Sequence, residues 1–201
     1  MKVPASDQRA IALASAAIAR GEVICLPTDT VYGIGADPFN TDAVTRLLTA
    51  KSRMRANPPP VLVAEGQAEE LSEEISPAAR ALMEAFWPGA MTIVVPTRAS
   101  IGWDLGETNG TVALRMPDSD TTLALLRAVG PLAVTSANQH GQPPATAVEA
   151  AMDQLGGAVS LYLDGGPSAG GVASTIVSVV GEPTILRQGA ISADAVWQAL
   201  A

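Results

Sequence analysis

Short apolar runs and amphipathic segments alternate along the chain, and their lengths predict a mixture of strands and helices. Apolar runs of about four to eight residues without helical periodicity are typical of buried strands. Such runs lie at 22–26, 61–64, 91–95, 111–116, 131–134, 160–163, 173–180 and 183–187. Some of them follow one another with no helix between, so we expect a mixed sheet rather than a purely parallel one.

Capping residues mark the predicted helices between these runs. The six expected helices begin at or just after Ser6, Asn40 or Thr41, Ser76, residue 119, Thr146 and Ser192. Gly21 and Gly156 are the expected stops of the first and fifth helices. The prolines at 58–60 end any helix before them, because proline lacks an amide donor and fixes φ.

This mixture of elements predicts the α/β fold class, with a mixed, twisted, open sheet and flanking helices. The chain has 201 residues, which suits a single domain with a substantial core. No repeat, linker or low-complexity tract divides it. We therefore expect one domain over residues 1–201.

Composition narrows the class of protein further. Hydrophobic residues make up 48% of the chain and charged residues 16%, as is typical of globular proteins. The single cysteine, Cys25, can form no internal disulfide. No apolar run approaches the ~20 residues of a membrane span, and the N-terminus has no secretory pattern. These features predict a cytoplasmic protein with no membrane contact.

The charge balance argues against nucleic acid as the main ligand. The net charge is −8, whereas domains that bind the phosphate backbone of nucleic acids usually carry a basic surface patch. Four of the twelve Lys and Arg residues nevertheless cluster within ten positions: Arg46, Lys51, Arg53 and Arg55. This cluster is consistent with a local anion site and equally with the cation-rich end of a helix.

Several familiar sites are missing from the sequence. The glycine-rich GGPSAGGVAST lacks the lysine of a P-loop, and GIGADP departs from the dinucleotide-binding fingerprint. One cysteine and one histidine cannot assemble a typical zinc site. A nucleophile–histidine pair would have to use His140, four residues after Ser136, but a loop histidine is more often polar surface.

Polar clusters instead follow or border the predicted strands, where ligands bind in open α/β sheets. They are PTDTVYG (27–33), KSRMRANPPP (51–60), Arg115, TSANQHG (135–141), Ser174-Thr175 and Arg187. For Arg115, two interpretations stay open: a solvent-facing position set by strand alternation, or a fork for a carboxylate or phosphate. For Lys51 and Arg53, two interpretations also stay open: they can bind a polyphosphate, or they can be cations at the C-terminal end of a helix, where positive charge is favoured.

Together, these motifs resemble the YrdC/Sua5 family in its single-domain, TsaC-type form. They are PTDTVYGIG, K-x-R followed by N-P, PGAMTIVV, VALRMP, TSAN and STIV…ILRQGAI. Each motif alone is weak, but the set spans about residues 10–190 in family order and is highly specific. The resemblance implies a YrdC-like fold with a large concave cavity on a twisted sheet, without the additional C-terminal Sua5 domain of longer relatives.

The resemblance also implies an activity. Members are threonylcarbamoyl-AMP synthases, which convert L-threonine, bicarbonate or CO2, and ATP into threonylcarbamoyl-adenylate and pyrophosphate. Mg²⁺ is expected to accompany ATP rather than to be held by protein side chains alone. Other proteins then transfer the threonylcarbamoyl group to an adenosine beside the anticodon, in the t6A modification of tRNA.

Carried over residue by residue, the resemblance implies two neighbouring subsites. The threonine subsite would comprise Thr30, Arg115, Val134, Thr135 and Ser174, with Arg115 pairing with the substrate carboxylate. The ATP subsite would comprise Lys51, Arg53, Asn57, Thr111, Ser136, Asn138, Pro144 and Arg187. Lys51 and Arg53 would lie nearest the phosphates and act in catalysis.

The segment PTDTVYG would form a substrate loop. Thr28 and Thr30 would offer hydroxyls, Tyr32 a wall, and Gly33 and Gly35 a close backbone approach. The chain also departs from the family pattern. Arg55 follows Met54 where a proline and then a lysine are common, Pro59 replaces a leucine, and Leu62 stands where histidine is frequent. Arg55 can replace the missing charge, whereas Leu62 bears on the shape of the threonine pocket.

Other functions stay open. Relatives have been described as binders of double-stranded RNA, so an RNA-binding module, or weak RNA binding beside the activity, is one alternative. A paralogue with the same fold and an altered activity is another. A third is a carbamoyl-adenylate-forming relative like the domain of hydrogenase maturation proteins, but those chains carry zinc-finger and acylphosphatase-like parts that this one lacks.

Overall fold

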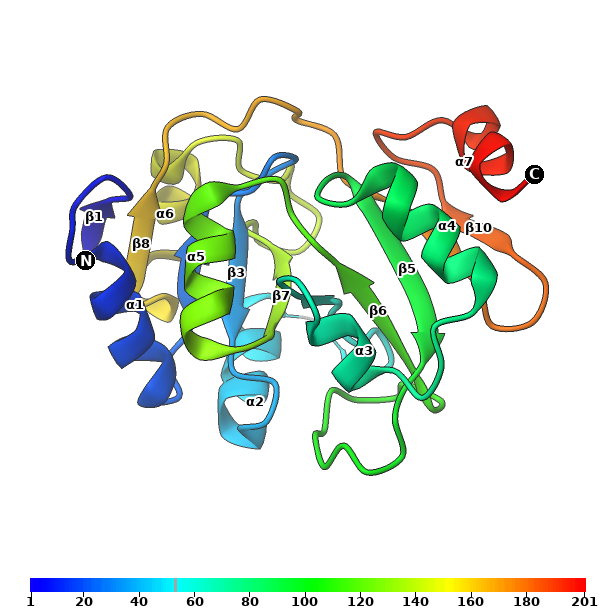
Figure 1. Ribbon diagram of the computed structural model, residues 1–201. Helices are drawn as coiled ribbons and strands as arrows, with labels where there is room; N and C mark the ends of the chain where they lie inside the picture. The colour runs from blue at the N-terminus through cyan, green and yellow to red at the C-terminus, as the bar shows by residue number, and fades with distance from the viewer. Residues whose placement is uncertain (53) are drawn as a thin grey trace.

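One mixed sheet runs through the molecule (Figure 1). The structure, a computed structural model, describes residues 1–52 and 54–201, so the predicted site residue Arg53 lies outside the described residues. The strands are β1 (Lys2–Pro4), β2 (Ile24–Leu26), β3 (Gly33–Ala36), β4 (Val61–Leu62), β5 (Met91–Pro96), β6 (Thr111–Arg115), β7 (Leu132–Ser136), β8 (Leu161–Asp164), β9 (Thr175–Ser178) and β10 (Thr184–Arg187). Their order across the sheet is β1-β8-β2-β3-β7-β4-β6-β5-β9-β10.

Parallel and antiparallel pairs both occur in this sheet. For example, β4 pairs with β6 in parallel and with β7 antiparallel. The two chain ends lie at opposite ends of the molecule, where β1 and β10 form the sheet edges (Figure 1). The predicted mixed α/β fold is therefore confirmed.

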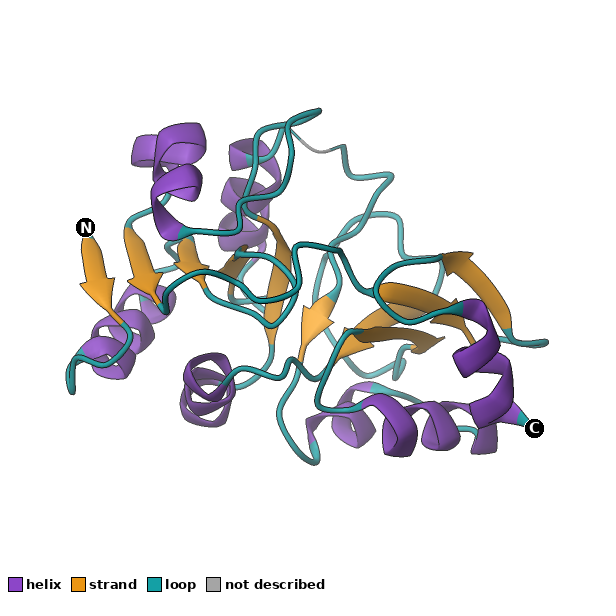
Figure 2. Ribbon diagram, turned by 90° about the horizontal axis from the view of Figure 1, so that it is seen from above, coloured by secondary structure: helices purple, strands orange, loops and turns teal. Residues whose placement is uncertain are grey.

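Helices flank the sheet. They are α1 (Ala10–Ala19), α2 (Thr41–Ala50), α3 (Gln67–Leu71), α4 (Pro77–Phe86), α5 (Asp120–Val129), α6 (Val148–Leu155) and α7 (Ala193–Leu200), with a 3₁₀ turn at Gly156–Ala158. Figure 2 shows helices on both sides of the strands near β1, and on one side toward β10. Among the described residues, no helix has the length and apolarity needed to cross a bilayer.

Strand alternation divides the core into two clusters, one on each face of the sheet. Cys25, Ile34 and Val61 contribute to one cluster, together with buried side chains of α2, α4, α6 and α7. Leu26 and Leu62 contribute to the other, which includes α1 and α5. Each cluster therefore joins residues from distant parts of the chain.

The helix caps show where local sequence dominates. The side chains of Asn40, Ser76 and Ser192 accept hydrogen bonds from backbone amides three residues later, as predicted. The predicted cap at Ser6 is wrong, because the chain turns there and α1 begins four residues later. The predicted cap at Thr146 is also wrong: Ala147 holds the capping position without a side-chain bond.

Strands β1 and β3 were not predicted, and β3 matters most for the site. Its residues Gly33 and Gly35 pair with β7, so this stretch is sheet rather than loop. A Cβ atom on Gly33 would lie 2.7 Å from Cγ1 of Val134, closer than van der Waals contact allows. The glycines do permit a close approach, and the group that approaches is the Val134 side chain of the neighbouring strand.

Candidate functional site

A cavity of about 280 Å³, here called the inner cavity, lies on the sheet face that carries α1 and α5. Its polar lining comes from Thr28, Thr30, Tyr32, Thr92, Arg115, Thr135, Ser136, Ser174 and Arg187. Its apolar lining comes from Val31, Gly33, Pro58, Pro60, Leu62, Ala113, Val134, Pro144, Ala173 and Ile176. These residues belong to β3, β4, β5, β6, β7, β9 and β10, and to loops next to these strands, including the loop between β2 and β3.

The loop after β2 forms one wall, and Thr28 shapes it. The Thr28 hydroxyl donates to the Val31 carbonyl at 2.6 Å and accepts from the Thr30 and Val31 amides. Such a threonine turn fixes the backbone of the loop. The loop also binds to α5, because the Thr122 hydroxyl donates to the Pro27 carbonyl at 2.6 Å. The loop is therefore held rigidly on both sides.

Arg115, at the end of β6, projects into the inner cavity beside this loop. Its residue is only 7% exposed, so the solvent-facing interpretation is wrong. Nη1 donates to Thr30 Oγ1 at 2.9 Å, Nη2 to Asp29 Oδ1 at 2.6 Å, and Nε to the Gly89 carbonyl at 2.9 Å. Since a guanidinium has five N–H bonds, these contacts leave two for a ligand.

The hydrogen bonds of the Thr30 hydroxyl determine which group of a ligand it can still bind. Thr28 uses its one proton on the Val31 carbonyl, so the 3.0 Å contact between the two hydroxyls favours Thr30 as the donor, which shares the acceptor side of Thr28 with the two amides at 3.3 Å. Thr30 Oγ1 accepts from Arg115 as well. One lone pair of Thr30 remains, which suits an N–H or O–H donor on a ligand.

The opposite wall is formed by Ser174, Thr92 and Arg187. The hydroxyls of Thr92 and Ser174, both buried, lie 2.8 Å apart. Arg187 Nη2 donates to the Ser174 carbonyl at 2.8 Å and to its hydroxyl at 3.3 Å. The segment after Arg187 is bound to β9, because Thr175 Oγ1 accepts from the Gly189 and Ile191 amides. Thr92, the one hydroxyl in the run MTIVV, was not predicted as a site residue.

The electrostatics of the inner cavity favour an anion. Its described lining holds two arginines and no acidic residue. Burial lowers the pKa of Arg115, although Asp29 opposes that shift, and the positive charge of Arg187 lowers it further. Burial also lowers the pKa of Arg187. The buried guanidinium of Arg115 and the more exposed one of Arg187 both line this space, so a carboxylate or phosphate placed between them would be stabilised.

Lys51 reaches the inner cavity from the side. It stands at the end of α2, is 7% exposed, and donates from Nζ to Ser136 Oγ at 3.1 Å and to the Asn138 carbonyl at 2.7 Å. Nζ also donates to Asn138 Oδ1. The Asn138 amide group in turn donates to the carbonyls of Gln139 and Gln142. The strand-end motif TSAN thus holds the lysine against the cavity wall.

The structure brings together most of the predicted site residues. Those that line the inner cavity are Thr30, Arg115, Val134, Thr135, Ser136, Pro144, Ser174 and Arg187. Lys51 and Asn138 contact the lining residue Ser136 directly or through one another. Asn57 precedes the lining residue Pro58, and Thr111 shares a strand face with Ala113 and Arg115.

Two departures from the family pattern have definite positions. Arg55 forms an ion pair with Asp104 and does not line the inner cavity, so its side chain points toward another loop. Leu62 does line the inner cavity and stands next to Arg115 in the strand register. An apolar side chain therefore borders the guanidinium.

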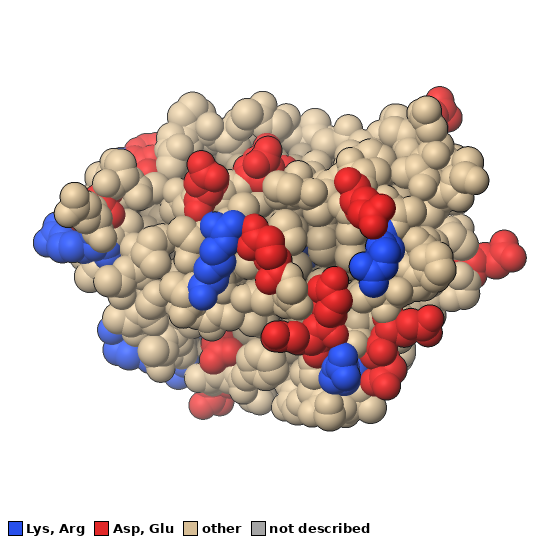
Figure 3. Space-filling view, in the orientation of Figure 1, with Lys and Arg blue, Asp and Glu red and all other residues tan. Residues whose placement is uncertain are grey.

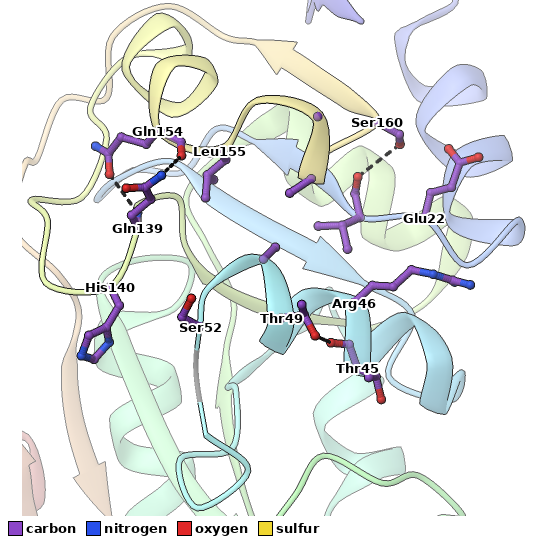
Figure 4. Close-up of a pocket in the computed structure, with 14 residues that line it drawn as sticks. Glu22, Thr45, Arg46, Thr49, Ser52, Gln139, His140, Gln154, Leu155 and Ser160 are labelled. Atoms are coloured by element: carbon purple, nitrogen blue, oxygen red, sulfur yellow. Dashed lines mark hydrogen bonds between the residues drawn. The ribbon is translucent and has the colours of Figure 1, made fainter.

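A second and larger space, the outer groove, lies between α2 and α6 and has a volume of about 850 Å³ (Figure 4). Its lining includes Arg46, Ser52, Gln139, His140 and Leu155, and none of the predicted site residues that the structure describes. His140 lines this groove, whereas Ser136 lines the inner cavity. This arrangement gives no support to a Ser136–His140 nucleophilic pair.

Fold and site together define an α/β protein with a cationic cavity on a mixed sheet. The chain belongs to the Sua5/YciO/YrdC family: residues 16–189 match the family model, whose description reads "Telomere recombination". The match covers most of the chain, and the predicted family is confirmed.

Three relatives show how close the similarity is. A Mycobacterium tuberculosis (strain H37Rv) protein, named provisionally as a threonylcarbamoyl-AMP synthase, is 47% identical over 199 residues, covering 98% of this chain and 92% of the relative. The Bacillus subtilis (strain 168) threonylcarbamoyl-AMP synthase is 41% identical, covering 90% of this chain and 54% of that protein. The crystal structure of P. abyssi Sua5 complexed with L-threonine is 33% identical with a TM-score of 0.88, covering 94% of this chain and 57% of that one. The chain thus spans nearly all of the first relative and little more than half of the other two.

Proposed function

We propose that this protein is a threonylcarbamoyl-AMP synthase, a nucleotidyltransferase that makes threonylcarbamoyl-adenylate and pyrophosphate from L-threonine, bicarbonate or CO2, and ATP. The observation that carries the proposal is the buried Arg115, whose guanidinium faces the inner cavity with two N–H bonds left for a ligand. The names of the mycobacterial and Bacillus relatives support the same activity.

In this proposal, L-threonine occupies the Arg115 side of the inner cavity. Its carboxylate pairs with the remaining Arg115 N–H groups, and the lone pair of Thr30 accepts a hydrogen bond from its amine or hydroxyl. Ser174, Val134 and Thr135 complete this subsite. Support comes from the L-threonine complex of P. abyssi Sua5, a related chain with the same fold.

ATP occupies the side bounded by Lys51, Ser136 and Arg187. The described residues Asn57, Thr111, Asn138 and Pro144 complete this subsite, and Arg53 stays a predicted member. In the structure, Lys51 Nζ donates to oxygen atoms of Ser136 and Asn138. Phosphate oxygens of ATP would take the place of some of these acceptors. Lys51 and Arg53 are the proposed catalytic cations.

The proposed reaction needs few acid–base groups. The amine of threonine and CO2 form a carbamate, with loss of one proton from nitrogen. A carbamate oxygen then forms a bond to the α-phosphorus of ATP, and pyrophosphate leaves with the electrons of the broken P–O bond. Charge builds on phosphate oxygens, so preorganised cations provide most of the stabilisation.

Mg²⁺ is proposed to arrive with ATP. No acidic side chain lines the described part of the inner cavity, and no three potential ligands gather among the described His, Cys, Asp and Glu residues. The donors that fit such an ion are therefore phosphate oxygens and water, and its role would be to neutralise phosphate charge. The product would pass to the proteins that modify tRNA, which implies a cytoplasmic reaction.

An RNA-binding module is the second candidate function, and the charge of one face of the molecule argues against RNA binding there. On the face shown in Figure 3, acidic side chains gather around α3, and no broad basic area is visible. The sequence around α3 includes Glu65, Glu69, Glu70, Glu73 and Glu74. Such a face repels a phosphate backbone. A paralogue with altered activity would keep the fold but would not make threonylcarbamoyl-adenylate.

Pyrophosphate release by the purified protein tests the proposal. We expect release from ATP and Mg²⁺ that requires both bicarbonate and L-threonine and is weak with L-serine. Omitting each substrate in turn provides the controls. A folded protein that binds ATP and releases no pyrophosphate with any amino acid would favour the paralogue, and salt-dependent RNA binding in its place would favour the RNA-binding module.

A further inference from the structure

Asp29 contacts Arg115 from outside the lining of the inner cavity. Asp29 Oδ1 accepts from Arg115 Nη2 at 2.6 Å, and its side chain is 18% exposed against 8% for the arginine. Asp29 does not itself line the inner cavity. We propose that Asp29 is a positioning residue for the reaction: it fixes the Arg115 guanidinium so that its free N–H groups face the substrate carboxylate.

Three contacts on different elements determine the orientation of the guanidinium. Thr30 and Asp29 bind Nη1 and Nη2 from the loop after β2, and the Gly89 carbonyl binds Nε from the segment before β5. Asp29 is the only one of the three partners that carries a charge. Holding an arginine side chain in one position costs much rotamer entropy, which strong contacts must offset. A charge-assisted hydrogen bond is stronger than a neutral one, so we expect Asp29 to contribute most to the orientation of the guanidinium.

Asp29 also has a fixed position of its own. Its Oδ1 accepts from the Asp118 amide at 3.1 Å, which ties the loop after β2 to the loop after β6. Two further bonds to the Pro27 carbonyl hold the same region, one from the Ser119 hydroxyl in the loop after β6 and one from the Thr122 hydroxyl in α5. Removing the Asp29 carboxylate would thus break its bond to the Asp118 amide and release the guanidinium, while the two bonds to Pro27 still join the loop to its neighbours.

The charge pattern explains why the carboxylate stands outside the inner cavity. Burial of an unpaired guanidinium is unfavourable, and Asp29 compensates it before any substrate arrives. Because Arg115 lines the inner cavity and Asp29 does not, an incoming carboxylate would meet the guanidinium rather than the Asp29 carboxylate. The site can then hold a buried arginine without placing a repelling charge next to the substrate.

This inference rests on the proposed function, and its test separates the two. In D29A and D29N we expect the KM for L-threonine to rise about tenfold or more, while the KM for ATP stays nearly unchanged. D29E, which keeps the charge, should recover part of the loss. E65Q removes an exposed carboxylate that pairs with Arg127, and it should leave both constants unchanged.

A second readout follows Arg115 directly, without turnover. The side-chain N–H signals of Arg115 in NMR spectra, assigned by their loss in R115K, should exchange slowly in the wild type and faster in D29A and D29N. Unchanged exchange together with an unchanged threonine KM would overturn the inference, as would an equal rise of both KM values. If the wild-type protein released no pyrophosphate with threonine, the proposed function would fail, and the exchange rates would still decide whether Asp29 positions Arg115.

Discussion

The guanidinium of Arg115 donates to the hydroxyl of Thr30 across 2.9 Å, joining the end of β6 to the loop after β2. These residues are 85 positions apart in the chain, and both are buried. The contact leaves Arg115 with free donors and Thr30 with a free acceptor on the same cavity wall. An α-amino acid offers the complementary pair, a carboxylate and an amine, on one α-carbon.

Replacing Arg115 should weaken threonine use selectively. A charge-assisted hydrogen bond contributes roughly 1.5–3 kcal/mol, so R115A should raise the threonine KM about 10- to 100-fold and the ATP KM far less. Steady-state kinetics with each substrate varied provide the measurement. R127A, which removes an exposed arginine paired with Glu65, is the matched control. Equal effects of R115A on both substrates would contradict the assignment of the two subsites.

Replacing Lys51 should act mainly on turnover. Lys51 is the described cation nearest the TSAN oxygens, and losing one preorganised donor to a developing phosphate charge typically costs about 10²-fold in kcat. We expect K51A to lower kcat by about that factor and to leave the threonine KM nearly unchanged. K2A, which removes a half-exposed lysine of β1, is the control. A K51A enzyme with normal kcat would exclude Lys51 from catalysis.

The contact between Gly33 and Val134 predicts a stability effect with a built-in rescue. A methyl group on Gly33 would overlap Cγ1 of Val134 at 2.7 Å, and overpacking of this kind costs about 1–3 kcal/mol. G33A should therefore lower the free energy of unfolding in urea by that amount, and the double variant G33A/V134A should regain part of it. A G33A protein as stable as the wild type would show that β3 and β7 can move apart.

The buried thiol of Cys25 predicts a loss of stability at high pH. Burial raises its pKa from 9.0 to about 12, and Tyr162, its partner in the strand register, shifts from 10.0 to about 12 for the same reason. Because both groups bind their protons more tightly in the folded state, their contribution is complete below pH 9.0 and is lost as the pH rises toward about 12.

Unfolding experiments on either side of that pH range measure the effect. The free energy of unfolding should fall by up to about 1.4 kcal/mol per pH unit for each such group. C25A should show a shallower decline just above pH 9.0, since Tyr162 does not contribute until higher pH. Identical slopes in the wild type and C25A would show that the thiol does not titrate as its burial implies.

Local sequence signals are enough to predict much of the fold. Asn40, Ser76 and Ser192 each cap a helix through a bond to a nearby amide, so the information lies within four residues. Ser6 carries the same local signal, but the turn after β1 takes up that segment, and β1 forms because β8 lies beside it. Pairing with a distant strand cannot be seen in a three-residue stretch.

The site shows the same division. Motif resemblance pointed to Thr30, Arg115 and Ser174, and the structure brings all three to one cavity. The motif PTDTVYG includes Asp29, but no role can be predicted for it from the sequence, because its partner Arg115 is distant in the chain. The sequence likewise favours a loop at β3, because two glycines weaken a strand pattern and only the proximity of Val134, distant in the chain, explains them.

The most direct test of the account is the identity of the nucleotide product made from ATP, L-threonine and carbon-13 bicarbonate. Mass spectrometry of the quenched reaction should reveal an adenylate that contains both threonine and the carbon-13 label, formed in step with pyrophosphate. An adenylate without threonine, or pyrophosphate released without a labelled product, would contradict the proposed synthase activity.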